Sequence, residues 1–143
     1  DLVMEKVNFA SGGIFFSSDT HRFLFLLRGD TSFSNKWGIV GGKRENSETD
    51  IDTIIRESRE ELGYLPYVRS MEVIDNYTSD DNKFQYSTYF ITVNDEFKPV
   101  LNKEHYGYCW VKNLCWPRPL HPGLLKTLSK DNIKEFISKK ISY

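Results

Sequence analysis

The sequence lacks the features of disulfide-rich and zinc-binding proteins. Among its 143 residues are two cysteines, Cys109 and Cys115, whose spacing matches neither a CxxC motif nor a zinc-ligand pair. The three histidines are scattered along the chain and do not form a metal-binding cluster. We therefore expect both cysteines to be free thiols in a reducing compartment, and we expect the protein to be cytoplasmic.

The sequence also lacks a long apolar run and an excess of charge of one sign. No stretch approaches the ~20 apolar residues that span a bilayer, and the first residues, DLVMEK, do not resemble a signal peptide. The net charge of −1 argues against a nucleic-acid backbone as the main partner. The length suits a single domain over residues 1–143. A small anion, or one already bound to a metal ion, stays open as its ligand.

The most informative stretch is residues 37–64, WGIVGGKRENSETDIDTIIRESREELGY. Its second half predicts a helix with Ser47 as N-cap and Asp50 as a short capping-box acid. Gly63 can adopt the left-handed conformation that ends a helix, and Pro66 follows it. Four apolar side chains at helical spacing predict the face that packs on a core: Ile51, Ile54, Ile55 and Leu62.

Acidic residues crowd a neighbouring face of this helix. Glu57, Glu60 and Glu61 stand at positions i, i+3 and i+4, where like charges cost roughly 0.2–0.5 kcal/mol per pair. The single guanidinium of Arg56 cannot neutralise all three, whereas a divalent cation could. A solvated acidic face is the simpler alternative, and it explains most glutamate-rich helices.

The two glycines ahead of the helix favour the cation. Gly41 and Gly42 have no Cβ, so a backbone carbonyl can approach a cation there, or an N–H group can approach a phosphate. Carboxylates on a helix beside such a loop suit Mg²⁺, which binds through few carboxylates together with substrate phosphates. The combination, more than the acidic face alone, predicts a metal site.

The spacing of these residues resembles a known signature. Gly42, five residues, Glu48, seven residues and then the run RESREELGY at residues 56–64 are similar to the Nudix box, G-x5-E-x7-R-E-U-x-E-E-x-G-U. Every fixed Gly, Glu and Arg of that pattern is present at its spacing. Two positions depart from the usual sequence: Ser58 replaces an apolar residue, and Val40 replaces the proline that often precedes the paired glycines. We expect Ser58 to affect packing more than chemistry.

The resemblance implies roles for the residues of the motif. The implied metal ligands are Glu57, Glu60, Glu61 and the carbonyl of Gly41, and the implied cation is Mg²⁺, with Mn²⁺ as a substitute. The remaining fixed residues, Gly42, Glu48, Arg56 and Gly63, are implied to be structural and to hold the loop against the helix.

The resemblance leaves the general base open between Glu60 and Glu104. Glu104 lies six residues ahead of Trp110, in a loop from which similar enzymes often draw a further metal ligand or base. The adjacent His105 could serve instead. For His105 we favour the alternative, an exposed loop histidine.

Substrate-binding residues outside the motif are less sharply defined. Arg28 ends a predicted strand, where the resemblance implies a position near substrate phosphates; a surface arginine is the alternative. Aromatic residues make up 15% of the chain, and those at strand ends or loops could stack on a nucleobase: Trp37, Tyr77, Phe84, Tyr86 and Tyr106. Nothing in the sequence chooses among these rings, and we carry Trp37 forward as the candidate.

The rest of the chain predicts strands and helices without βαβ regularity. We expect a hairpin from residues 7–16 and 22–28, strands over residues 68–76, 84–93 and 108–111, and helices over residues 120–128 and 131–140. Gly12 and Gly13, inside the first strand, suggest a bulge or close packing. This mixture predicts an α+β fold. The resemblance implies the Nudix α/β/α sandwich, a mixed sheet between helices.

We expect a Mg²⁺-dependent hydrolase that cleaves a diphosphate linkage in a small nucleotide derivative. On the resemblance alone, ADP-ribose and dinucleoside polyphosphates are favoured and (d)NTPs come second, while a capped RNA end is the one nucleic acid considered. Monomer and homodimer are both open. A second hypothesis is a catalytically silent module that binds a nucleotide as a sensor, which the complete acidic set opposes. A calcium-binding or acidic interaction surface ranks last, because no EF-hand pattern is present.

Overall fold

The computed structural model describes residues 6–29 and 31–142. The elements follow one another as β1 (Asn8–Ser17), β2 (Arg22–Arg28), β3 (Trp37–Gly38), β4 (Val40–Lys43), α1 (Asp50–Leu62), β5 (Val68–Thr78), β6 (Phe84–Val93), β7 (His105–Lys112), α2 (Pro122–Leu128) and α3 (Asp131–Ile141). Strands β2 and β6 have the predicted bounds. The bounds of β1, β5, α2 and α3 differ from those predicted by at most two residues at either end.

The strands form one mixed sheet. Its order is β3-β2-β1-β6-β5, with β4 paired to β1 and β7 paired to β2. The β1–β6 pair is parallel and the other pairs are antiparallel. The predicted hairpin is present, with Phe16 opposite Phe23. On the other half of β1, Gly12 lies opposite Gly41 of β4, so this pairing brings the glycine motif to the centre of the sheet.

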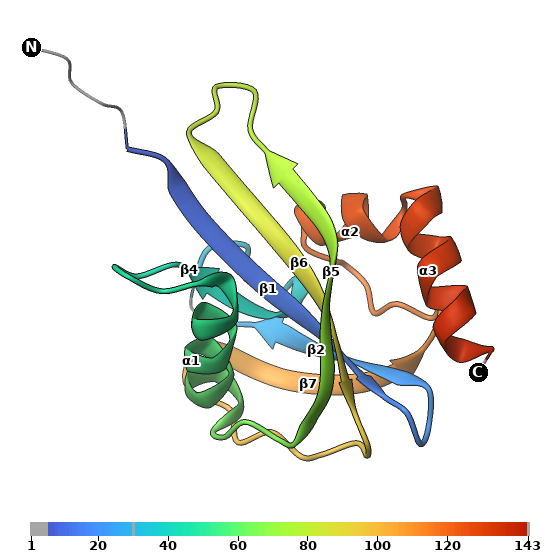
Figure 1. Ribbon diagram of the computed structural model, residues 1–143. Helices are drawn as coiled ribbons and strands as arrows, with labels where there is room; N and C mark the ends of the chain where they lie inside the picture. Colours follow the sequence, from blue (N-terminus) through green and yellow to red (C-terminus); the bar gives the residue numbers. More distant parts are fainter. Residues whose placement is uncertain (1–5, 30, 143) are drawn as a thin grey trace, which may run out of the picture.

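Helices cover both faces of this sheet. Figure 1 shows α1 on one side and the α2–α3 pair on the other. Because strand side chains alternate between faces, β1 and β2 contribute side chains to two hydrophobic cores, one on each face of the sheet. The core beneath α2 and α3 includes Ile14, Phe16, Phe23, Phe25, Ile133 and Ile137. The core beneath α1 includes Phe15, Leu24, Leu26, Ile54 and Leu62. The α+β class and the α/β/α sandwich are thereby confirmed.

The predicted start of helix α1 is wrong by two residues. The N-cap is Thr49, whose hydroxyl accepts a hydrogen bond from the Asp52 N–H group at 3.1 Å, while the Asp52 carboxylate accepts one from the Thr49 N–H group at 3.0 Å. Ser47 instead lies in the preceding turn with φ = 70°. Asp50 cannot complete a box with Ser47 because its carboxylate binds Arg44 at 2.6 Å.

Two further predictions of local structure need correction. Ile51 does not face the core: it is 44% exposed, since the buried positions at the start of α1 are Thr53 and Ile54. Strand β7 is longer than predicted, because it pairs with β2 over that strand's full length, from Arg22 opposite Lys112 to Arg28 opposite His105. The short strands β3 and β4 were not predicted. Gly12 and Gly13 reflect close packing: an added Cβ would collide with the Tyr86 hydroxyl at Gly12 and with Ile91 at Gly13.

Candidate active site

The candidate site lies where α1 packs against β4, and both glycines of the motif touch carboxylates of the helix there. The Gly41 N–H group donates a hydrogen bond to Glu61 Oε1 at 3.3 Å. A Cβ on Gly42 would lie 2.6 Å from the Glu57 carboxylate. Glycine at position 42 therefore allows this carboxylate to rest directly on the strand.

A buried acid, Glu61, lies in this site. It is only 3% exposed. Burial raises the pKa of its carboxyl group well above the ordinary value; hydrogen bonding and repulsion from Glu57 and repulsion from Glu104 raise it further, while the Gly41 N–H group opposes the rise. A buried carboxylate is expensive unless a positive charge compensates it. The site therefore favours a cation.

Arg56 neutralises the other side of the acidic cluster. Its Nε and Nη2 atoms donate hydrogen bonds to Glu48 at 2.8 and 3.1 Å, and its Nη1 atom donates one to Glu57 at 2.7 Å. A fourth bond, at 2.9 Å, reaches the Lys43 carbonyl. This fork holds the pKa of Glu48 down at about 2. The geometry fits a structural role in which Glu48 and Arg56 tie the loop to α1.

Glu60 and Glu104 lie at the rim of the site. Glu60 has a side chain 53% exposed and 3.4 Å from Arg56 Nη1. Glu104 is exposed, but its charge reaches Glu61. Asn102 holds the two segments together: its Nδ2 atom donates to the Glu60 carbonyl and its Oδ1 atom accepts from the Glu104 N–H group, both at 3.0 Å. The structure thus pairs Glu57 with Glu61 and leaves two further acids beside them.

The interpretation of His105 as an exposed loop residue is wrong. It is the first residue of β7, and its side chain is 5% exposed. Its Nε2 atom lies 3.6 Å from Glu61 Oε2, while its Nδ1 atom is buried with no hydrogen-bond partner among the described residues. Burial, with a smaller contribution from the charge of Arg28, lowers the pKa of His105 to about 4. The imidazole is therefore neutral at pH 7 and does not compensate Glu61.

The two substrate-binding candidates occupy different environments. Arg28 donates a hydrogen bond from Nε to the Ser32 carbonyl at 2.8 Å, and its charge is felt by His105 and by Tyr86 on β6. It therefore lies beside the acidic cluster. Trp37 is half-buried and packs against the core beneath α2 and α3, so much of its ring is committed to packing.

The residues present fit a divalent cation. The uncompensated charge of Glu61 and the Glu57 carboxylate resting on Gly42 provide hard oxygen ligands next to the backbone of Gly41. Within residues 6–29 and 31–142, no group of three or more His, Cys, Asp or Glu residues is arranged to hold a metal ion. Glu57 and Glu61 are two carboxylates, and Mg²⁺ binds through one or two carboxylates and keeps several water molecules.

The model of the NUDIX domain family matches residues 8–122. The chain belongs to the Nudix family. The matched region runs from β1 to the first residue of α2, so it contains all the candidate residues described above.

Two relatives are similar to this chain over part of their own length. "Putative 8-oxo-dGTP diphosphatase 3" of Mycobacterium tuberculosis is 34% identical over 108 residues, which cover 72% of this chain and 48% of that protein. "Nucleoside triphosphate pyrophosphatase/Nudix hydrolase fusion protein" of Bifidobacterium longum is 32% identical over 94 residues, which cover 64% of this chain and 18% of that protein. The chain thus spans about half, or less, of the length of these relatives.

Solved Nudix structures share the fold. RenU, a Nudix hydrolase from M. smegmatis, has a TM-score of 0.72 at 19% identity. The matched region covers 96% of this chain and 89% of the RenU chain. The NUDIX domain of Shewanella oneidensis NrtR, solved with ADP ribose, has a TM-score of 0.69 at 15% identity and covers 94% and 90%. At these identities the likeness establishes the Nudix fold alone.

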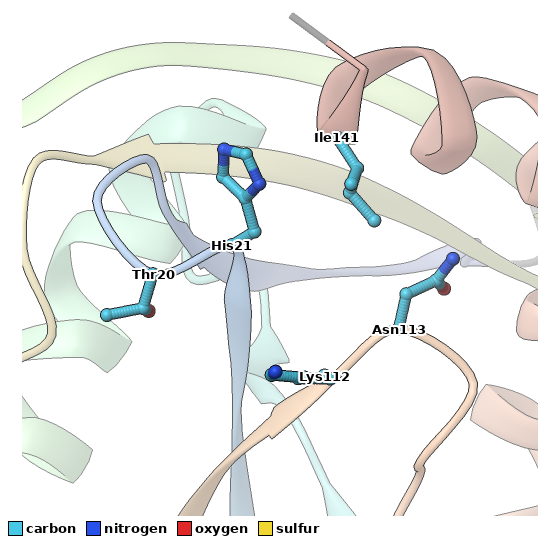
Figure 2. Close-up of a pocket in the computed structure, with 5 residues that line it drawn as sticks. All are labelled: Thr20, His21, Lys112, Asn113 and Ile141. Atoms are coloured by element: carbon cyan, nitrogen blue, oxygen red, sulfur yellow. The ribbon is translucent and has the colours of Figure 1, made fainter.

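A groove of about 360 Å³ lies away from the acidic cluster of this Nudix domain (Figure 2). It is lined by Thr20 and His21 from the β1–β2 turn, Lys112 and Asn113 from the end of β7, and Ile141 from α3. Strands β2 and β7 connect this groove to the candidate site. At the candidate site β2 ends with Arg28, and β7 begins with His105. Seven strand residues separate the two places by about 20 Å.

Two features of the Nudix site escaped sequence reasoning. The burial of His105 depends on pairing between β2 and β7, which are far apart in the chain. The link that Asn102 makes between Glu60 and Glu104 could have been predicted from local sequence, because an asparagine two residues ahead of Glu104 can form an Asx turn.

None of the described helices is long and apolar enough to cross a membrane.

Proposed function

We propose that this domain hydrolyses a diphosphate linkage in a nucleotide derivative and uses a divalent cation, Mg²⁺ or Mn²⁺, to do so. The observation that carries the proposal is the pairing of Glu57 with the buried, uncompensated Glu61 beside the Gly41 backbone. Membership of the Nudix family supports the same reaction class.

The proposed chemistry divides between the cation and the protein. When bound, the cation polarises phosphoryl oxygens and lowers the pKa of a bound water. Glu57, Glu61 and the Gly41 carbonyl would hold it. Arg56 and Glu48 fix the loop, so the carboxylates do not have to reorganise as charge develops.

We favour Glu104 over Glu60 as the residue that removes a proton from the attacking water. The Glu60 carboxylate lies 3.4 Å from Arg56 Nη1 and is held beside that guanidinium. Glu104 is exposed to incoming substrate and close enough to interact with Glu61. Arg28, on the other side of His105, would contact substrate phosphates. We keep Trp37 as a substrate-binding candidate, because its ring is only half-buried and its exposed part could contact the substrate.

The proposed substrate is a small nucleotide with a diphosphate linkage, and two classes compete. ADP-ribose and dinucleoside polyphosphates are favoured by the resemblance of the motif. The (d)NTP class is favoured by the name of the M. tuberculosis relative, "Putative 8-oxo-dGTP diphosphatase 3". We propose a cytoplasmic enzyme that acts as a monomer or a homodimer. A capped RNA end is the only nucleic acid that we consider as a substrate.

The test is hydrolysis of ADP-ribose, diadenosine polyphosphates, sugar nucleotides, capped RNA and (d)NTPs, including 8-oxo-dGTP, side by side with Mg²⁺. Identification of products by chromatography separates the classes, since only (d)NTPs release inorganic pyrophosphate. Turnover of one class with the cation, and none without it, is the expected result. Binding of these nucleotides with no turnover of any would contradict hydrolysis and favour the sensor.

A further inference from the structure

The inference concerns His105, a buried imidazole with no role in the chemistry proposed above. Its side chain is 5% exposed and that of Glu61 is 4% exposed, so the two groups face each other out of contact with bulk water. A buried polar side chain needs hydrogen-bond partners. The Nδ1 atom of His105 has none among the described residues.

The fold fixes the backbone of His105 at two points. The His105 backbone pairs with Arg28 of β2 where the β2–β7 register shifts, and its N–H group donates to the Asn102 carbonyl at 3.3 Å. Asn102 in turn donates to the Glu60 carbonyl on α1. This chain of contacts sets the distance between the start of β7 and the helix that carries Glu61.

The two oxygens of Glu61 meet different donors. Oε1 accepts a hydrogen bond from the Gly41 N–H group at 3.3 Å, and Oε2 lies 3.6 Å from His105 Nε2. The carboxylate is the acceptor that faces Nε2, so the geometry assigns an N–H group to Nε2. This group would orient the carboxylate through one of its two oxygens.

We propose that His105 is a positioning residue that donates a hydrogen bond from Nε2 to Glu61 Oε2 and thereby orients this carboxylate toward the divalent cation. The inference rests on the proposed function in one respect, that Glu61 is a metal ligand. The two atoms are 3.6 Å apart in the structure, which is beyond hydrogen-bond distance, so the proposed bond requires them to move closer. Partners of this kind behind a ligand commonly change metal affinity or activity 10–100-fold when removed.

The experiment measures Mn²⁺ binding without nucleotide, by electron paramagnetic resonance of free Mn²⁺. We expect His105→Leu to raise the Kd about 10–100-fold, and His105→Gln, which keeps an N–H donor, to recover part of the loss. His21→Gln, at the distant groove, is the matched control and should bind as the wild type does. Equal binding by wild type and His105→Leu, or no recovery by His105→Gln, would overturn the proposal.

A double-mutant cycle keeps the proposal testable if His105→Leu does not fold. Once Glu61→Gln has removed the acceptor charge, His105→Gln should cause no further change in Mn²⁺ affinity. Independent, additive losses would refute an action through Glu61. Because binding is measured without substrate, its loss can be separated from a failure of hydrolysis. A protein that hydrolyses no nucleotide but binds Mn²⁺ through His105 would contradict only the proposed reaction.

Discussion

Ser58 shows how one side chain of the Nudix box departs from the family pattern. It is fully buried on α1, and its Oγ atom has no hydrogen-bond partner among the described residues. Thr53, five residues earlier, is equally buried, but its hydroxyl lies 3.1 Å from both the Thr49 carbonyl and Glu48. Two buried hydroxyls on one helix therefore differ in whether they are satisfied.

We predict that Ser58→Ala stabilises the protein by about 1 kcal/mol, because alanine removes an unsatisfied hydroxyl and is the better helix former. Thr53→Ala is the matched control and should cost about 1 kcal/mol through its lost hydrogen bonds. Urea denaturation of both variants measures these changes. Destabilisation by Ser58→Ala would mean that Ser58 makes a bond that the structure does not show.

At the residue scale, the sequence predicted positions that depend on spacing along the chain. The close placement of Glu57 and Glu61 follows from their separation by four residues on one helix. The burial of His105 could not be predicted in this way, because it depends on where β7 begins its pairing with β2. Trp37 likewise packs against the core through contacts with elements distant in sequence.

At the scale of the element, the ion pair between Glu48 and Arg56 is one of the contacts that attach α1 to the preceding loop. Glu48 accepts two hydrogen bonds from Arg56, and this guanidinium lowers its pKa to about 2. An acid with a lowered pKa stabilises the fold fully above its unfolded pKa, near 4.5, and the stabilisation is lost as the pH falls toward 2.

We therefore predict that Glu48→Gln is less stable than the wild type at pH 7 and that the two proteins converge between about pH 4.5 and pH 2. Unfolding free energies measured across this range give the comparison. Glu135→Gln is the control, since Glu135 and Lys139 form an exposed pair at 3.3 Å that should contribute little. A constant gap between wild type and Glu48→Gln at every pH would contradict the assignment.

The same element shows why helix existence was predictable and its start was not. Ser47 and Thr49 are each followed three residues later by an aspartate, so local sequence offers two capping boxes. Asp50 is engaged by Arg44 of the preceding loop and by the Tyr89 hydroxyl of β6, which leaves Asp52 to cap. The short strands β3 and β4 are likewise formed by their pairing with β2 and β1.

At the scale of the whole molecule, we expect cation binding to be coupled to folding. Helix formation alone brings Glu57 and Glu61 together, but their placement against Gly41 and Gly42 requires α1 to pack against β4, so an unfolded chain offers no such site. Ligands that bind only the folded state stabilise it by mass action, by about 2.7 kcal/mol at a hundred times the Kd.

We predict that saturating Mg²⁺ raises the melting temperature of the wild type and leaves that of Glu57→Gln nearly unchanged. Thermal unfolding with and without Mg²⁺ measures the shift, with KCl of matched ionic strength as the salt control. Glu135→Gln should respond as the wild type does, because its carboxylate lies on α3. An equal rise in all three proteins would point to a general salt effect.

The most direct measurement compares wild type and Glu61→Gln across the same nucleotide panel with Mg²⁺. Glutamine keeps the shape and can still accept the Gly41 hydrogen bond, but it lacks the charge. We predict that turnover falls at least about 100-fold, in line with the loss of a ligand-shell group, while the melting temperature without Mg²⁺ stays within a few degrees. Full activity in Glu61→Gln would contradict the proposal that this buried carboxylate holds the catalytic cation.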